Sequence, residues 1–334
     1  MYATAPESPA NTGQVQRSDT GSAAEHPFGF QFDYTPPKGG YAWWYVDGVS
    51  ADGAHAIVII IFVGSVFSPY YAWSKTQDPA NHCAINLALY GQPQRWSMTE
   101  RGQADTERTR TTYQTGNSAV RFTRDGLEID FNEISTPWLQ RVRGTVRVTL
   151  PYLNAQAFQL DPNARHFWSP ACSHAHISVD FDNPDLSWQG SSYVDSNYGL
   201  EPVTEGFDFW DWSRSPLQNG DTLIRYVTDP VGAAQRDLHV RISPEGVVDP
   251  AASTQLADLP PTRIWRIPRR TGAIDGAEPK IARTLEDTPF YSRSILTYSD
   301  AASGHATHET LSCHRLRSPI VKALLPFRMP RLSG

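Results

Sequence analysis

The sequence has little cysteine: Cys83, Cys172 and Cys313 are the only ones among its 334 residues. They lie far apart and form no Cys-x-x-Cys pair. This spacing argues against a disulfide framework and against a cysteine-rich zinc site. A reducing, cytoplasmic compartment is therefore the simpler expectation.

The sequence also lacks a hydrophobic run long enough to cross a membrane as a helix. Its most apolar stretch, AIVIIIFVGSVF at residues 56–67, is shorter than the roughly 20 residues that such a helix needs. Its isoleucine and valine content predicts instead a strand buried on both faces. Residues 1–27 are rich in Ser, Ala, Thr, Glu and Pro, which predicts a disordered leader rather than a secretory signal.

Basic tracts and nucleotide-binding motifs are missing as well. The formal net charge is −6 and Lys and Arg are scattered, so we expect no nucleic-acid partner. There is no Gly-x-Ser-x-Gly elbow, no Gly-x-Gly-x-x-Gly after a strand and no P-loop. Serine hydrolases, nicotinamide enzymes and NTPases are thus poorly supported, and we expect chemistry without a metal or organic cofactor.

Strand signals dominate the rest of the chain. Residues 141–150 alternate between basic or hydroxyl side chains and apolar ones, and Asp125-Gly126 separates two short apolar runs as in a hairpin. Further strands are predicted through the second half, including 263–267 and 308–316, with one short helix within 320–330. We predict an all-β chain with two β-rich halves, residues 28–155 and 156–334; a single large sandwich is the alternative.

The densest group of chemically capable side chains lies between residues 166 and 214. Tyr193, Asp195 and Asn197 are two residues apart, so on a strand they share one face. A carboxyl facing inward among tryptophan rings has a raised pKa and stays protonated near neutral pH. The alternative is a turn in which Asp195 and Asn197 bond to the local backbone.

A metal site is a competing interpretation of the same region. His174 and His176, with His166 and either Asp180 or Asp182, supply enough ligands for one ion. However, His-x-His on a strand is a short, common pattern without a distinctive spacing to a third ligand. The two histidines are equally compatible with ordinary hydrogen bonding.

Six motifs occur in order along the chain: GGYAWWYVD (39–47), FVGSVFSPYY (62–71), HFWSP (166–170), YVDSNYG (193–199), FWDWSR (209–214) and LPFRMPR (325–331). Together they are similar to those of the carotenoid 1,2-hydratases, also called hydroxyneurosporene synthases. The resemblance runs from about Phe28 to the C-terminus, and its specificity comes from the order of the motifs rather than from any one of them.

The resemblance implies two lipocalin-like β-barrel or sandwich domains in tandem. It also implies hydration of the C1=C2 bond of acyclic carotenoids such as neurosporene and lycopene, in the spheroidene and spirilloxanthin pathways of phototrophic bacteria. The family's catalytic residues fall on His166, Trp168, Tyr193 and Asp195. The family pattern has a small residue, often Gly, before the Tyr, where this chain has Ser192.

Those residue types suit the reaction. In our hypothesis Asp195 protonates C2, and Trp168 and Tyr193 stabilise the tertiary cation at C1. His166 positions a water molecule and takes its proton. The substrate-binding residues that we predict are Asn197 and four aromatic residues: Trp43, Tyr45, Trp210 and Trp212.

Other functions stay open on the sequence alone. The two-domain lipocalin-like group also includes pericyclases, which act on other polyenes or terpenoids and do not need Asp195. A non-catalytic carotenoid or lipid carrier needs the apolar pocket but no acid. We expect a protein peripheral to the photosynthetic membrane, with Ile320–Leu332 as an interfacial anchor or as a packed terminal element. The oligomeric state stays open.

Overall fold

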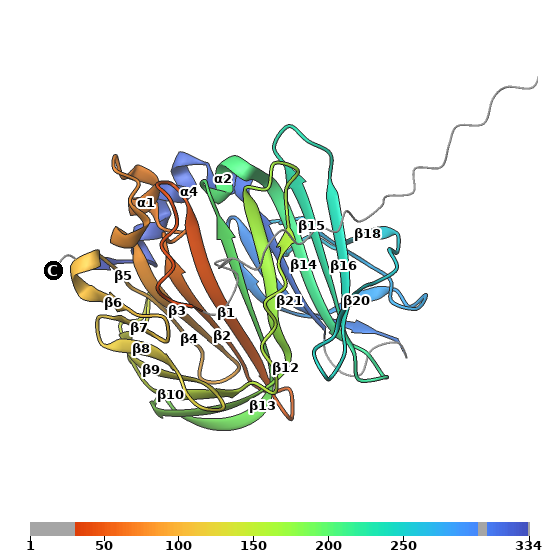
Figure 1. The fold of residues 1–334 in the computed structure, drawn as a ribbon, viewed down its shortest axis with the longest axis horizontal. Helices are drawn as coiled ribbons and strands as arrows, with labels where there is room; N and C mark the ends of the chain where they lie inside the picture. Colours follow the sequence, from red (N-terminus) through yellow and green to blue (C-terminus); the bar gives the residue numbers. More distant parts are fainter. Residues whose placement is uncertain (1–30, 300–305, 333–334) are drawn as a thin grey trace, which may run out of the picture.

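The computed structural model describes residues 31–299 and 306–332. This part of the chain is mainly β-structure, with two large sheets packed face to face (Figure 1). The prediction of an all-β chain with two antiparallel units is confirmed. The predicted leader, residues 1–27, falls outside the described residues.

The first sheet is large and curls into a half-barrel (Figure 1). Among the described residues it has 14 strands, and its main path runs β23-β5-β3-β2-β1-β13-β12-β10-β9-β8-β7-β6. The pairs are antiparallel except for β23 with β5. The strands are β1 Tyr41–Ser50, β2 Ala56–Val63, β3 Cys83–Tyr90, β4 Arg95–Met98, β5 Glu100–Arg101, β6 Thr106–Arg108, β7 Thr112–Thr115, β8 Ser118–Phe122, β9 Gly126–Ile134, β10 Arg141–Thr149, β11 Phe158–Gln159, β12 His166–Asn183, β13 Asp185–Gly199 and β23 Arg331–Leu332.

The second sheet covers the side of the first sheet that carries Tyr41, Trp43 and Tyr45. Within the described part of the chain it has seven strands, and a separate hairpin packs beside β14. In sheet order, the strands are β17 Val248–Pro250, β16 Arg236–Ile242, β15 Thr222–Pro230, β14 Phe207–Pro216, β22 Ala306–Ser312, β21 Tyr291–Tyr298 and β20 Pro279–Asp287, and the hairpin is β18 Leu256–Leu259 with β19 Arg269–Gly272.

Strand β1 shows how the sequence sets this arrangement. Its alternate side chains point to opposite faces. Ala42, Trp44 and Val46 pack into the core inside the curled sheet. Tyr41 and Trp43 pack instead against the second sheet. Because both faces are apolar, β1 is buried almost throughout its length and lies near the centre of the molecule.

The short helices gather largely at one end of the two sheets, where the labels α1, α2 and α4 lie close together in Figure 1. The predicted helix within 320–330 is confirmed as α4 and η3. No helix in the described residues is both long and apolar enough to span a bilayer. The helices are α1 Pro69–Trp73, α2 Val203–Gly206, α3 Cys313–Leu316 and α4 Pro319–Leu324, and the 3₁₀ turns are η1 Pro79–Asn81, η2 Gln103–Asp105 and η3 Leu325–Phe327.

Two of the predicted strands are corrected by the structure. Residues 263–267 form a bend, because the Asp287 carboxylate accepts the backbone N–H groups of Ile264 and Trp265. Strand β22 ends at Ser312, whose side chain accepts the backbone N–H of Arg315 and begins α3 there.

The chain changes from the first sheet to the second between Gly199 and Phe207. Strands β12 and β13, which we assigned to the C-terminal half, thus pair within the first sheet. The division into domains at residues 155 and 156 stays a prediction.

Candidate active site

Asp195 lies in the middle of the first sheet, on β13 between β1 and β12. Its carboxyl is buried and faces the second sheet. The Oδ2 atom accepts two hydrogen bonds, one from the Trp168 indole N–H at 2.9 Å and one from the Tyr193 hydroxyl at 2.9 Å. The Oδ1 atom is buried and has no hydrogen-bond partner among the described residues.

Burial raises the pKa of Asp195 to about 8. The hydrogen bonds from Trp168 and Tyr193 oppose this rise, and the negative charges of Glu309 and Asp47 add to it. No Lys or Arg side chain pairs with this carboxyl in the described structure. Burial and the absence of a cationic partner therefore favour the protonated form of Asp195 at neutral pH, and its hydrogen-bond donors are neutral.

Aromatic rings surround this carboxyl. The Tyr193 and Trp212 ring centroids are 5.3 Å apart. The Tyr226 and Trp168 rings meet edge to face, and their centroids are 5.6 Å apart. All four rings belong to one buried cluster that both sheets contribute to. The carboxyl is therefore surrounded mainly by aromatic rings, with the Arg214 guanidinium over the Tyr193 ring, 5.2 Å from its centroid.

The other predicted binding residues lie in the same cluster. Trp43 contacts Trp210, with ring centroids 5.9 Å apart, and the Asn197 amide donates a hydrogen bond of 3.3 Å to the Tyr226 hydroxyl. Tyr45 packs edge to face on Tyr193. The structure thus places all five predicted binding residues in the space between the sheets, and their contact with substrate stays a prediction.

Tyr45 also belongs to a buried charge network beside Asp195. Its hydroxyl donates to Glu309 at 2.8 Å. Asp47, the next inward residue of β1, pairs with Arg214 at 2.7 Å and with Arg293 at 2.9 Å. Arg293 pairs with Glu309 as well. Two carboxylates and two guanidinium groups offset one another, so this network is held together by its own charges.

His166 belongs to a different set of contacts. Its ring is fully buried, its Nδ1 lies 3.0 Å from the Tyr41 hydroxyl, and its Nε2 lies 3.4 Å from a Glu201 carboxylate oxygen. Its backbone pairs with Gly199, four residues along β13 from Asp195, which corresponds to about 13 Å along the strand. Burial lowers the pKa of His166.

Two glycines make room for the His166 ring. A β-carbon on Gly206 would lie 2.0 Å from its Nε2, and one on Gly199 would lie 2.7 Å from its Nδ1. Neither position accepts a side chain without moving the imidazole. The ring is thus held closely by backbone from β13 and α2.

The proposed metal ligands do not converge. His174 lies 2.9 Å from the Tyr152 hydroxyl and 2.7 Å from the Gly220 carbonyl, whereas His166 contacts Tyr41. Among residues 31–299 and 306–332, no group of three or more His, Cys, Asp or Glu side chains is placed to hold a metal ion. His174 and His166 thus serve separate hydrogen-bond groups.

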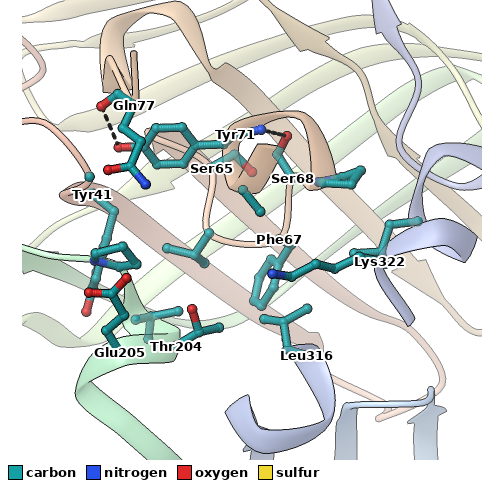
Figure 2. Close-up of a pocket in the computed structure, with 17 residues that line it drawn as sticks. Tyr41, Ser65, Phe67, Ser68, Tyr71, Gln77, Thr204, Glu205, Leu316 and Lys322 are labelled. Carbon is teal, nitrogen blue, oxygen red and sulfur yellow. Dashed lines mark hydrogen bonds between the residues drawn. The ribbon is translucent and has the colours of Figure 1, made fainter. Parts of the chain in front are cut away.

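A cavity of about 120 Å³ opens at the end of the sheets where the helices gather. Tyr41 and Phe67 line it from the first sheet side, and Leu316, Lys322 and Leu325 line it from the C-terminal segment. Figure 2 shows the Lys322 side chain extending across this cavity beside Phe67. Tyr41, which lines this cavity, also contacts His166 and belongs to the buried cluster whose rings surround Asp195.

The family model of carotenoid hydratase CrtC matches residues 59–334. The chain belongs to this family. It is 43% identical to the acyclic carotenoid 1,2-hydratase of Thiocapsa roseopersicina, over 92% of this chain and 76% of that protein. It is 39% identical to the enzyme of the same name from Rubrivivax gelatinosus, over 90% and 76% of the two chains.

The fold of this CrtC family member also occurs in a solved structure. A Nitrosomonas europaea protein assigned as AttH superposes with a TM-score of 0.58 at 15% identity, over 93% of this chain and 100% of the other. At this identity the likeness concerns the fold alone.

The sequence did not reveal every residue near Asp195 in this CrtC family member. Tyr226, Arg293 and Glu309 reach the cluster from β15, β21 and β22. Each lies in a strand whose alternation suggests only burial. The one available signal is a charged residue within a strand that is otherwise uncharged, as for Arg293.

Proposed function

We propose that this protein adds water to the terminal C1=C2 bond of acyclic carotenoids and yields 1-hydroxy carotenoids. Membership of the carotenoid hydratase family and the names of the relatives support the reaction class. The observation that carries the proposal is Asp195, a buried acid whose pKa is raised to about 8 inside an aromatic cluster. The C1=C2 bond of neurosporene or lycopene is the substrate group that fits such a site.

The hydrogen bonds of Asp195 indicate where its proton lies. Oδ2 already accepts from Trp168 and Tyr193, so the acidic proton belongs on Oδ1. Oδ1 has no protein acceptor in the described structure. An alkene carbon placed against Oδ1 therefore receives the proton directly. The carboxylate that is left keeps both hydrogen bonds, which stabilise its charge.

Protonation at C2 leaves a tertiary cation at C1. The faces of Trp168, Tyr193 and Trp212 supply negative electrostatic potential in a space without bulk water, where a cation–π contact contributes about 2 kcal/mol or more. The new carboxylate of Asp195 adds an opposite charge nearby. Water then attacks C1, and loss of its proton completes the tertiary alcohol.

His166 remains our hypothesis for the group that takes the proton of the attacking water. The strand register limits how His166 can take part, because it lies at the level of Tyr41 and about 13 Å along the strands from Asp195. The pair Asn197 and Tyr226 lies between these two levels and offers a hydroxyl and an amide for an intervening water. His166 thus takes the proton of the water that attacks C1 through such a polar group. It makes no direct contact with Asp195.

Conversion of neurosporene or lycopene by the purified protein in heavy water tests the proposal. We expect a 1-hydroxy product with one deuterium at C2, and with ¹⁸O at C1 when labelled water is used. A bound but unchanged carotenoid overturns the hydratase assignment in favour of a carrier. Replacing His166 by Gln should lower the rate without lowering deuterium content per product; an unchanged rate removes His166 from the mechanism.

A further inference from the structure

The C-terminal segment, Cys313–Leu332, has apolar side chains on two opposite sides. On the inner side, Leu325 is buried and lines the cavity. On the outer side, Ile320, Leu324 and Phe327 are exposed by 74%, 47% and 80%. Spacings of four and three residues place these three on one face of the continuous turn formed by α4 and η3.

Such a segment is not explained by packing within this chain alone. A surface helix normally buries one apolar stripe and presents polar residues on the other side. Here the outward stripe is apolar too, and contiguous exposed apolar side chains mark a contact with another partner or with a membrane.

A second exposed apolar group lies beside this segment. At the bend within residues 263–267, Ile264 is 74% exposed and Trp265 is 42% exposed. Two hydrogen bonds from their backbone N–H groups to Asp287, at 2.7 and 3.2 Å, fix the bend. Arg315, in α3, donates to the Trp265 carbonyl at 2.6 Å and so joins the bend to the C-terminal segment.

We define the basic–apolar face by five exposed apolar side chains and by the Lys and Arg residues of the two segments that carry them. The five are Ile264, Trp265, Ile320, Leu324 and Phe327. Cys313–Leu332 contains five Lys or Arg residues and no Asp or Glu, although the whole chain carries a formal charge of −6. Positive charge is therefore concentrated where the apolar side chains are exposed.

Part of this positive charge is not paired with a carboxylate and is available to a partner. Arg315 donates to backbone carbonyl oxygens, so its charge is not offset by a carboxylate there. Lys322 makes no ion pair with any described residue. Arg263 and Arg266 flank Ile264 and Trp265 and are exposed. The remaining three cations of the segment, Arg317, Arg328 and Arg331, pair with acidic side chains.

We propose that the basic–apolar face docks on an anionic lipid bilayer and that the adjoining cavity is the opening through which the polyene enters. Exposed Trp, Ile, Leu and Phe with interspersed Lys and Arg are the composition that inserts at the boundary between headgroups and acyl chains. An apolar polyene dissolves in the bilayer rather than in water, so an enzyme that takes it up directly needs its opening against the lipid. This second part rests on the proposed function.

A series of ring contacts leads from the opening to Trp43, on the strand beside Asp195. Phe67 lines the cavity and contacts Phe62, with centroids 5.7 Å apart, and Phe62 contacts Trp43 at 6.2 Å. Trp43 pairs with Asn197, two residues from Asp195. The ring contacts thus link the opening to the pair of strands, β1 and β13, that carries Asp195.

Vesicle flotation without any carotenoid tests the docking step independently of catalysis. The wild-type protein should rise with vesicles of phosphatidylcholine containing about half phosphatidylglycerol, and less so at high salt, because salt screens the basic residues. Replacing Ile264, Trp265, Ile320, Leu324 and Phe327 by Ser should weaken the partition at least about tenfold. These side chains are exposed, so the folded state should persist, which circular dichroism checks.

The matched control replaces Leu153 and Val247, which are also exposed, by Ser. Val247 lies in the turn after β16, and Tyr152, next to Leu153, contacts that turn at Gly246, away from the basic–apolar face. This variant should float like the wild type. Wild-type protein that stays at the bottom of the gradient overturns the proposal, and so does a five-residue variant that floats normally. A wild-type dimer that the five-residue variant converts to a monomer assigns the face to self-association instead.

Conversion of detergent-dispersed carotenoid separates the two proposals. If the protein floats but converts nothing, the docking face stands and the hydratase assignment fails. If it converts dispersed substrate but does not float, the hydratase assignment stands and the docking face fails.

Discussion

Asp195 and Asp211 are both buried carboxyls, but their neighbours differ. Asp195 faces the space between the sheets and accepts hydrogen bonds from the neutral donors Trp168 and Tyr193. Asp211, on β14, pairs with Arg270 at 2.9 Å and accepts a hydrogen bond from Thr310 at 2.6 Å. Burial raises the pKa of both, to about 8 for Asp195 and to about 6 for Asp211.

The difference teaches what keeps a buried acid ready to give up a proton. Arg270 favours the charged form of Asp211, so this carboxyl is largely ionised at neutral pH and contributes to structure. Asp195 has only neutral donors and stays protonated. Depth of burial alone therefore does not distinguish a catalytic acid from a structural one; the charge of the nearest donors does.

The largest expected effect is on the rate of hydration. Asp195→Asn removes the proton donor but keeps the shape, so kcat should fall about 10²–10⁴-fold. Asp211→Asn should change kcat less than tenfold, because Asp211 is not in the space between the sheets. Product formation by chromatography measures both rates, with circular dichroism to check folding. Equal losses in the two variants contradict the distinction between the two carboxyls.

The second-largest expected effect is on stability: the contributions of Asp195 and Asp211 to the free energy of unfolding should depend on pH over different ranges. Both carboxyls have pKa values in the folded state above the value near 3.9 of an unfolded chain, so the folded protein binds more protons and loses stability as pH rises. For Asp195 the loss extends from about pH 4 to about pH 8, at up to about 1.4 kcal/mol per unit. For Asp211 it ends near pH 6.

Urea unfolding at roughly pH 5, 7 and 9 measures these windows. The advantage of the wild type over Asp195→Asn should shrink up to about pH 8. A difference between the two proteins that is independent of pH shows that Asp195 titrates normally.

The smallest expected effect is a displaced pH profile. Tyr193→Phe removes one donor to the Asp195 carboxylate, so the pKa of Asp195 should rise further, by less than about one unit. The alkaline fall of kcat/KM should move to higher pH by the same amount, while kcat drops because the carboxylate is less stabilised. Tyr226→Phe is the control, because its hydroxyl contacts Asn197 and not Asp195. A profile that shifts in the control but not in Tyr193→Phe contradicts this role.

Local patterns predicted much of the site. The two-residue spacing of Tyr193, Asp195 and Asn197 placed them on one face, because strand periodicity is short-range, and the structure agrees. The sequence could not reveal which partners come from afar. Asp211 and Arg270 meet across 59 residues, and Asn197 meets Tyr226 across 29, through sheet packing that no local pattern records.

Two irregular features of the structure could not be predicted from the sequence. Strand β12 has shifts in register on both sides of Cys172, so counting alternate residues across it does not predict facing side chains. The RIWRI pattern at 263–267 is rich in Ile and Trp, which favour strands, but Asp287, more than 20 residues away, accepts the backbone N–H groups of Ile264 and Trp265. In both places a non-local contact overrides a local preference.

Strand β23 has a consequence for how the protein is made. It pairs with β5, so residues 331 and 332 complete an edge of a sheet whose other strands end by residue 199. During synthesis this edge stays open until the ribosome has released residue 332, after all strands of the second sheet. Because contacts between distant residues form only after both partners have been made, the edge at β5 stays unpaired in the nascent chain over most of its translation, which is the kind of exposed strand edge that favours aggregation.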